Sequence, residues 1–278
     1  MSAALPPGVA RARTAPELLV ALATADATRP RLTWYDDHPG PTRGERIELS
    51  ARVLVNWVAK ASNLLADELA VERGDVVRLA LPPHWRTVYW ALAAWQVGAV
   101  LHITPDVTRD DAAVLVTDRT DDGEPAADRL VAVSLPALAR SWTGGSLGTV
   151  PLPSGAVDEA AELAGQPDLF AAVDEPTPDD DALVAAGQRL TGAAVLAAAR
   201  QRAGDRGWST GERVALTPGA DQADADLLLD LLAAWSVDGS VVLVRDAEDE
   251  QLLARWQAER VTSAWAPPGT PASRPSPR

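Results

Sequence analysis

Apolar and polar residues recur with two different periods along this chain, and each change of period marks a change of element. Behind Ser50, apolar side chains recur at three- and four-residue steps as far as Leu69, which predicts a long helix with Ser50 as its N-cap. Short unbroken apolar runs such as 76–81 predict buried strands instead. We expect strands at 32–35, 47–49, 76–81, 99–103, 112–117, 130–133, 182–186, 213–217, 240–244 and 261–264. We expect helices at 51–69, 84–97, 136–142, 157–163, 192–203, 223–237 and 248–259.

Strands that alternate with helices are typical of parallel sheets with right-handed crossovers. The sequence therefore predicts an α/β fold, with mostly parallel sheets and helices on both faces. Its predicted parts are an N-terminal extension with a short helix (1–30), a first βα subdomain (31–142), a linker rich in glycine, proline and acidic residues (143–181), a second βα subdomain (182–266) and a disordered tail (267–278).

Composition narrows the chemistry that the fold can carry. The 278 residues hold 25 basic and 39 acidic side chains, for a net charge of −14, so we expect neither a nucleic-acid partner nor a membrane surface. The absence of cysteine excludes disulfides, thiolate metal sites and cysteine nucleophiles. No apolar run reaches membrane-spanning length and no secretory signal is present, so we expect a cytoplasmic protein. Lys60 is the only lysine, and we expect its tip to be solvated beside Trp57.

The order of the elements resembles the N-terminal part of the AMP-dependent synthetase and ligase superfamily, the adenylate-forming, acyl-CoA synthetase-like enzymes. The first match lies in 47–118, and two later ones read GERVALTPGADQADADLLLDLLAAWSVDGSVVLV and EQLLARWQAERVTSAWAPP. The residues that occupy family positions in the first match are 47–50, Val71, 74–77, 81–83, 98–100 and 113–118. More narrowly, the chain resembles a short actinobacterial group related to these enzymes.

The phosphate-binding loop of that family, a Ser/Thr/Gly-rich run ending in Pro-Lys-Gly, is expected after the strand at 182–186. The run 187–192 stands there instead, and we interpret it as a tight turn into the next helix. The alternative alignment makes Thr191 and Gly192 a remnant of the loop that would bind a nucleotide cofactor. Neither alignment supplies a lysine, and the acidic run 179–181 adds repulsion toward a triphosphate.

The loop after Thr217 lacks the histidine that the family usually carries there, and the resemblance ends near 267, before the nucleotide-binding segments and the lid domain of the family. The resemblance therefore predicts a non-catalytic pseudo-ligase without a cofactor, which acts as a binding or scaffold module for a protein partner or a small acyl ligand. The alternative is a residual AMP-dependent ligase that binds ATP, Mg²⁺ and an acyl substrate, completed by a partner chain. A third hypothesis is a small-molecule-binding α/β protein with no ligase ancestry.

Other chemical patterns are weaker. His38, His84 and His102 lack zinc-ligand spacing, but His84 follows a strand at its carboxyl edge and is our ligand-binding candidate. The run 144–148 matches a phosphate cradle and a nucleophile elbow in letters only, because no strand precedes it and no helix follows, so we expect a flexible linker. The acidic pairs at 110–111 and 121–122 fit solvated loops. We expect Trp85 and Trp90 to be partly exposed. No catalytic residue or metal site is predicted.

Overall fold

Two mostly parallel sheets form the framework of the protein in a computed structural model, which describes residues 4–103, 112–120, 127–144, 150–185, 187–219 and 223–265. The first sheet has the strand order β12-β10-β11-β1-β2. Its strands are β1 (Pro30–Asp36), β2 (Arg46–Ser50), β10 (Arg213–Leu216), β11 (Ser240–Arg245) and β12 (Ser263–Trp265). Only β2 runs antiparallel to its neighbour.

The second sheet has seven strands in the order β7-β6-β5-β3-β4-β8-β9. They are β3 (Val76–Ala80), β4 (Val100–Ile103), β5 (Ala112–Thr117), β6 (Ala127–Ala132), β7 (Val157–Asp158), β8 (Asp181–Ala185) and β9 (Gln188–Thr191). Only β9 is antiparallel to its neighbour. The predicted α/β class with mostly parallel sheets is confirmed.

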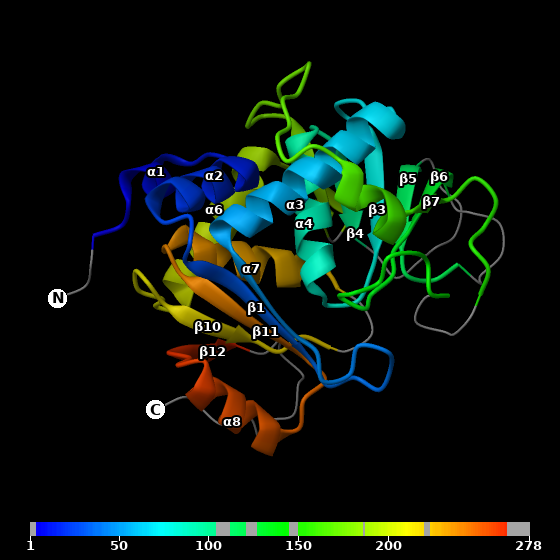
Figure 1. Cartoon of the computed structure of the whole chain (residues 1–278). Helices are drawn as coiled ribbons and strands as arrows, with labels where there is room; N and C mark the ends of the chain where they lie inside the picture. The colour runs from blue at the N-terminus through cyan, green and yellow to red at the C-terminus, as the bar shows by residue number, and fades with distance from the viewer. Residues whose placement is uncertain are drawn as a thin grey trace.

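Helices fill the space between the sheets and cover them. They are α1 (Pro7–Arg11), α2 (Ala15–Ala25), α3 (Ala51–Asn63) with a π-helical continuation at Leu64–Glu68, α4 (Trp85–Gln96), α5 (Glu159–Glu162) with a 3₁₀ turn at Leu163–Gly165, α6 (Gly192–Asp205), α7 (Ala225–Ser236) and α8 (Asp249–Ala258). Helices α4 and α7 each contact strands of both sheets, and α8 covers the outer face of the first sheet (Figure 1). One apolar core runs through strands of both sheets, and a smaller one lies under α8.

Local sequence signals explain the ends of the helices. The Ser50 hydroxyl accepts a hydrogen bond from the backbone N–H of Val53 at 3.3 Å, as its predicted N-cap role requires. Gly98 ends the turn after α4 with a φ of +82°, which favours glycine. After α7, a Cβ on Gly239 would lie 2.5 Å from the Ala234 carbonyl oxygen, so only glycine fits this close approach.

The two sheets do not follow the predicted subdomain ranges. Strands β1 and β2, from the predicted first subdomain, pair into the sheet of β10–β12, while β8 and β9, from the second, pair into the sheet of β3–β7. The predicted linker also carries structure, because it contains β7 and α5. The chain thus crosses between the sheets on both sides of 143–181.

Several expectations about single elements are wrong. No helix forms at 136–142, and the sequence analysis missed α1 at Pro7–Arg11 and the strand β9. Trp85 and Trp90 are 3% and 1% exposed, because α4 lies inside the core rather than on a face. The tail 267–278, the acidic pairs at 110–111 and 121–122 and most of the glycine run 144–148 lie outside the described residues.

Candidate functional site

The hairpin of β8 and β9 occupies the place where the resemblance puts the phosphate-binding loop. Ala185 at the end of β8 pairs with Gln188 at the start of β9, so the two strands connect within two residues. Gly187 in this connection has a φ of +75°. The next four residues, Gln188–Thr191, form β9 and pair with β8 as the edge strand of the second sheet. The sequence analysis rightly expected a tight turn, but it placed the turn directly before the helix and missed the strand.

Thr191 and Gly192 lie at the other end of the hairpin, roughly 10 Å along β9 from the turn. The Thr191 hydroxyl caps α6 by accepting from the N–H of Ala194 at 3.2 Å. The N–H of Gly192 donates to the Asp180 carbonyl at 3.0 Å, and that of Ala193 donates to the Pro178 carbonyl at 2.8 Å. The first three N–H groups of α6 are therefore all occupied by the chain itself.

His84, the predicted ligand-binding residue, is fully buried and acts as the N-cap of α4. Its Nδ1 accepts from the N–H of Arg86 at 3.1 Å, and its ring lies edge-on to Trp34 with centroids 4.2 Å apart. Burial holds the pKa of His84 well below its ordinary value, and the positive charges of Arg86 and Arg245 lower it further. The ring is therefore neutral at pH 7. Within the described residues, Nε2 has no well-formed hydrogen bond, and His84 lines none of the cavities described below.

A buried ionic cluster lies on the same helix. Arg86 Nη1 is 2.9 Å from Glu159 Oε1, and the Tyr89 hydroxyl donates to the same oxygen. The Arg86 guanidinium also lies over the Trp85 ring, 4.4 Å from its centroid, and Trp57 stacks on Tyr89. Burial raises the pKa of Glu159, while Arg86 and the Tyr89 hydroxyl oppose that rise. The sequence analysis missed this cluster, because Arg86 and Glu159 are 73 residues apart.

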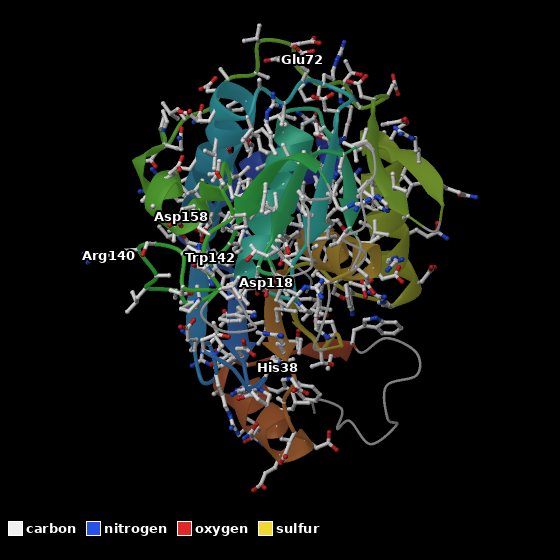
Figure 2. The ribbon with its side chains drawn as sticks, turned by 90° about the vertical axis from the view of Figure 1, so that its right-hand side faces the viewer. His38, Glu72, Asp118, Arg140, Trp142 and Asp158 are labelled. Atoms are coloured by element: carbon white, nitrogen blue, oxygen red, sulfur yellow. The ribbon has the colours of Figure 1, made fainter. Side chains whose placement is uncertain are left out.

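A cavity of about 280 Å³ opens at the carboxyl ends of the strands, where open α/β sheets bind ligands. Figure 2 looks onto this side of the molecule, with Asp118 and His38 labelled. The cavity is lined by residues that follow strands of both sheets: His38, Pro39, Gly40, Pro41, Thr42, Pro82, Asp118, Arg119, Leu135 and Arg245. Several polar groups here bind one another, since Arg245 and Thr42 both donate to Asp36 Oδ2 and His38 Nδ1 lies 3.0 Å from Asp246.

A second cavity, of about 260 Å³, lies beyond β10 against Thr217, Pro218 and Trp265. The Arg206 guanidinium forms part of its wall between two indoles, 3.8 Å from the centroid of Trp265 and 5.0 Å from that of Trp208. Asp230 pairs with Arg206 at 2.8 Å and with Arg202 at 2.7 Å. The sequence analysis missed this network. The four-residue spacing of Arg202 and Arg206 at the end of α6, matched by that of Asp226 and Asp230 on α7, is a signal that could have found it.

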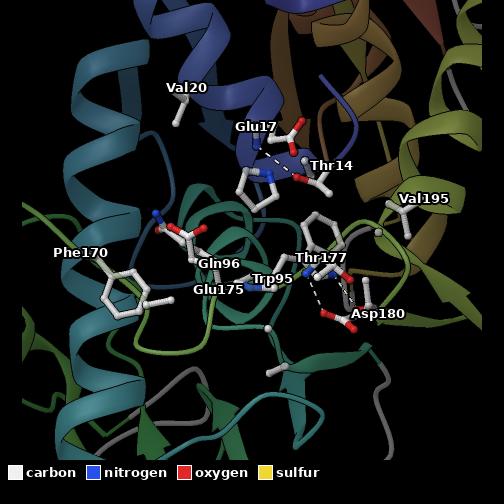
Figure 3. Close-up of a pocket in the computed structure, with 18 of the residues that line it drawn as sticks. Thr14, Glu17, Val20, Trp95, Gln96, Phe170, Glu175, Thr177, Asp180 and Val195 are labelled. Atoms are coloured by element: carbon white, nitrogen blue, oxygen red, sulfur yellow. Dashed lines mark hydrogen bonds between the residues drawn. The ribbon is translucent and has the colours of Figure 1, made fainter. Parts of the chain in front are cut away.

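A third cavity, of about 540 Å³, lies at the opposite end of the second sheet, against the amino ends of β4 and β8. Its walls come from the start of α2, the end of α4, the segment 170–177 and the start of α6 (Figure 3). Gly192 is one of its lining residues and Thr191 is not, so the cavity receives only one of the two predicted cofactor-binding residues. We call this the amino-edge cavity.

Lys60 does not have the solvated tip that the sequence predicted, and that expectation is wrong. Its ammonium donates to the carbonyl oxygens of Ala164 and Gln166 and pairs with Asp168 at 3.1 Å, leaving the side chain 18% exposed. Asn63, on the same helix, donates to the carbonyls of Pro167 and Leu169 at 3.0 Å each. Together they hold the segment 164–169 on α3.

Over the part of the chain that the structure describes, no group of three or more metal-ligating side chains is placed to hold a metal ion. None of the described helices combines the length and the apolar character that crossing a bilayer requires.

Comparisons with known proteins agree with this architecture. A protein of Mycobacterium tuberculosis (strain ATCC 25618 / H37Rv) described as "TIGR03089 family protein" is 34% identical over 245 residues, which cover 86% of this chain and 92% of the relative. The crystal structure of Brucella canis acyl-CoA synthetase superposes with a TM-score of 0.65 at 17% identity, over 90% of this chain. That match spans 47% of the synthetase, about half its length, and at this identity it shows the shared fold alone. No family model matches the chain.

Proposed function

The chain belongs to the TIGR03089 family, and from that premise we propose that it is a ligand-binding protein on an acyl-CoA-synthetase-like fold which does not itself form acyl adenylates. In this proposal the protein uses no nucleotide cofactor, and its role lies in what it binds, a small molecule or a protein partner.

The connection between β8 and β9 carries the proposal. A phosphate-binding loop works by turning several free backbone N–H groups toward the phosphoryl oxygens. Here only two residues separate Ala185 from Gln188, and β9 is paired with β8 from Gln188 onward. Without three charge-assisted hydrogen bonds, binding of a triphosphate weakens by about 5–9 kcal/mol. That corresponds to about four to six decades of affinity.

The start of α6 offers no replacement. The N–H groups of Gly192, Ala193 and Ala194 donate to oxygens of Asp180, Pro178 and Thr191, so none is free for a phosphate. The nearby carboxylates of Asp180 and Asp181 repel a polyanion. These contacts favour a structural role for Thr191 and Gly192 over their alternative role as a remnant of the phosphate loop.

Binding of ATP–Mg²⁺ to the purified full chain tests the proposal. A ligand at 100 times its dissociation constant stabilises the folded state by about 2.7 kcal/mol, which a thermal-shift assay resolves. We expect no shift at millimolar ATP–Mg²⁺ and no carboxylate-dependent exchange of pyrophosphate into ATP. A saturable shift with ATP, absent with magnesium alone, would overturn the proposal in favour of a residual ligase.

A further inference from the structure

The amino-edge cavity has the size of a small-molecule site and lies away from the carboxyl edge. Its volume of about 540 Å³ falls within the range of about 300–1,000 Å³ that ligand pockets occupy. Segments that are distant in sequence build it, since residues 14–21, 95–99, 170–182 and 192–195 all contribute. The cavity is therefore a product of the tertiary fold.

Much of the wall is apolar, with two aromatic rings. Trp95 is held in place because its indole N–H donates to the Ala182 carbonyl at 2.7 Å, and Phe170 comes from the segment opposite (Figure 3). Val20 of α2 is 54% exposed and adds an aliphatic side chain to this wall. An apolar ligand body would remove this surface from water.

The charged side chains that line the cavity are all acidic. Four carboxylates line it, those of Glu17, Glu175, Asp180 and Asp181, and none of the described lining residues is basic. Arginines outside the lining pair with three of the four, since Arg13 pairs with Glu17, Arg73 with Asp180 and Arg189 with Asp181.

Glu175 differs from the other three carboxylates. Within the described part of the chain it makes no ion pair, and it lies on the same side of the cavity as Gln96 in Figure 3. Glu175 is exposed and has no ion partner among the described residues, so it is open to a ligand from solvent. An acyl carboxylate or a phosphate would be repelled by the lining carboxylates, whereas a cation can pair with Glu175.

We propose that the amino-edge cavity binds a small organic cation, an amine with an aryl or alkyl body of a few carbons. This names the ligand class of the proposed binding protein and rests on that function. The body packs between Val20, Trp95 and Phe170, and the ammonium group lies toward Glu175. The charge of the ligand, more than its shape, sets the selectivity of the site.

Three probes with one body and different head groups test the charge selectivity: 3-phenylpropylamine, 3-phenylpropanol and 3-phenylpropionate. Titration by calorimetry at pH 7 is expected to show saturable binding of the amine, binding of the alcohol weaker by about tenfold, and no binding of the carboxylate. Equal affinity for amine and alcohol would overturn the proposal, and so would the absence of saturable amine binding.

Two variants and a matched control place the site. Glu175→Gln is expected to weaken amine binding threefold to tenfold and leave alcohol binding unchanged, and Ala172→Trp, which fills the cavity, is expected to abolish both. Glu250→Gln removes an exposed carboxylate on α8, across the first sheet, and is expected to leave the affinity unchanged. Equal weakening by Glu175→Gln and Glu250→Gln would overturn the site.

Failure of this inference is distinguishable from failure of the proposed function. If the parent protein shows no saturable amine binding and no thermal shift with ATP–Mg²⁺, the cation site alone is overturned. Saturable binding of ATP–Mg²⁺ overturns the proposed function whatever the amine titration shows.

Discussion

Arg86 of α4 and Glu159 of α5 form an ion pair of 2.9 Å whose side chains are 4% and 0% exposed. Arg86 also donates to the Pro136 carbonyl at 3.2 Å. One guanidinium therefore binds both the segment that follows β6 and the first residue of α5. Desolvation of such charges offsets much of their attraction, so the pair stabilises the fold only while both partners are present.

Removing one partner is therefore expected to cost more than the pair contributes. Glu159→Leu leaves the Arg86 charge buried and lowers the free energy of unfolding by about 3–5 kcal/mol. The double variant Arg86→Met/Glu159→Leu regains most of that loss, and urea denaturation measures both. Arg189→Ala serves as a control, because its pair with Asp181 is exposed and contributes about 0–1 kcal/mol. If Glu159→Leu lowers the free energy of unfolding by less than about 1 kcal/mol, the pair is not buried as described.

The contacts of Lys60 lead to a chemical prediction. Since it is the only lysine and its ammonium is held by two carbonyls and Asp168, an amine-directed acylating reagent is expected to modify it slowly in the native protein. In 6 M urea the same residue is expected to react at the rate of a free lysine. Peptide mass spectrometry follows the site, with the α-amino group as the internal control. Equal rates in both states would mean that Lys60 is solvated.

Removing the Lys60 ammonium is expected to raise local opening in one segment and to leave the global stability of the protein unchanged. Lys60→Met removes the donors to Ala164 and Gln166, so hydrogen exchange is expected to rise within 163–169 while α4 keeps its protection. Lys60→Arg keeps the charge and is the matched control. A uniform rise across the chain would show that the variant destabilises the global fold instead.

The elements that the sequence predicted well are those with local signals. Ser50 and Gly98 stand at ends of helices, and their capping and turn preferences act over a few residues. Strand partners carry no such signal, which is why the pairing of β1 with β11, more than 200 residues later, was not foreseen. The burial of Glu159 was not predicted either, because its partner Arg86 is 73 residues away in sequence.

The candidate site was predictable to the same extent. The short connection after β8 follows from chain length alone, since few residues stand between this strand and the next helix. The amino-edge cavity was not predictable, because Val20, Trp95 and Phe170 show no common pattern and meet only in the folded chain.

The role of Thr191 separates a helix cap from a remnant of a phosphate loop. Thr191→Ala is expected to lower the free energy of unfolding by about 1 kcal/mol, since it removes the acceptor for the Ala194 N–H. Thr191→Ser keeps the acceptor and is expected to match the parent protein. Thermal denaturation with and without ATP–Mg²⁺ measures both effects. A nucleotide response that appears in the parent and disappears in Thr191→Ala would assign the residue to phosphate binding.

Glu259, after α8, is expected to make stability depend on pH in the acid range. It accepts hydrogen bonds from the Tyr35 hydroxyl at 2.6 Å, from Arg46 at 2.8 Å and from Arg213. Burial opposes its ionisation, but these donors outweigh burial and lower its pKa below the ordinary 4.5. Because the folded pKa is the lower one, the stabilisation is complete above about pH 4.5 and is lost as the pH falls through the folded value.

Glu259→Gln is therefore expected to be less stable than the parent by about 1–3 kcal/mol at pH 7. The two proteins are expected to converge toward pH 3, as measured by urea midpoints across that range. Glu250→Gln, which removes an exposed carboxylate within α8, is expected to follow the parent curve. A gap between parent and Glu259→Gln that stays constant with pH would contradict the assignment.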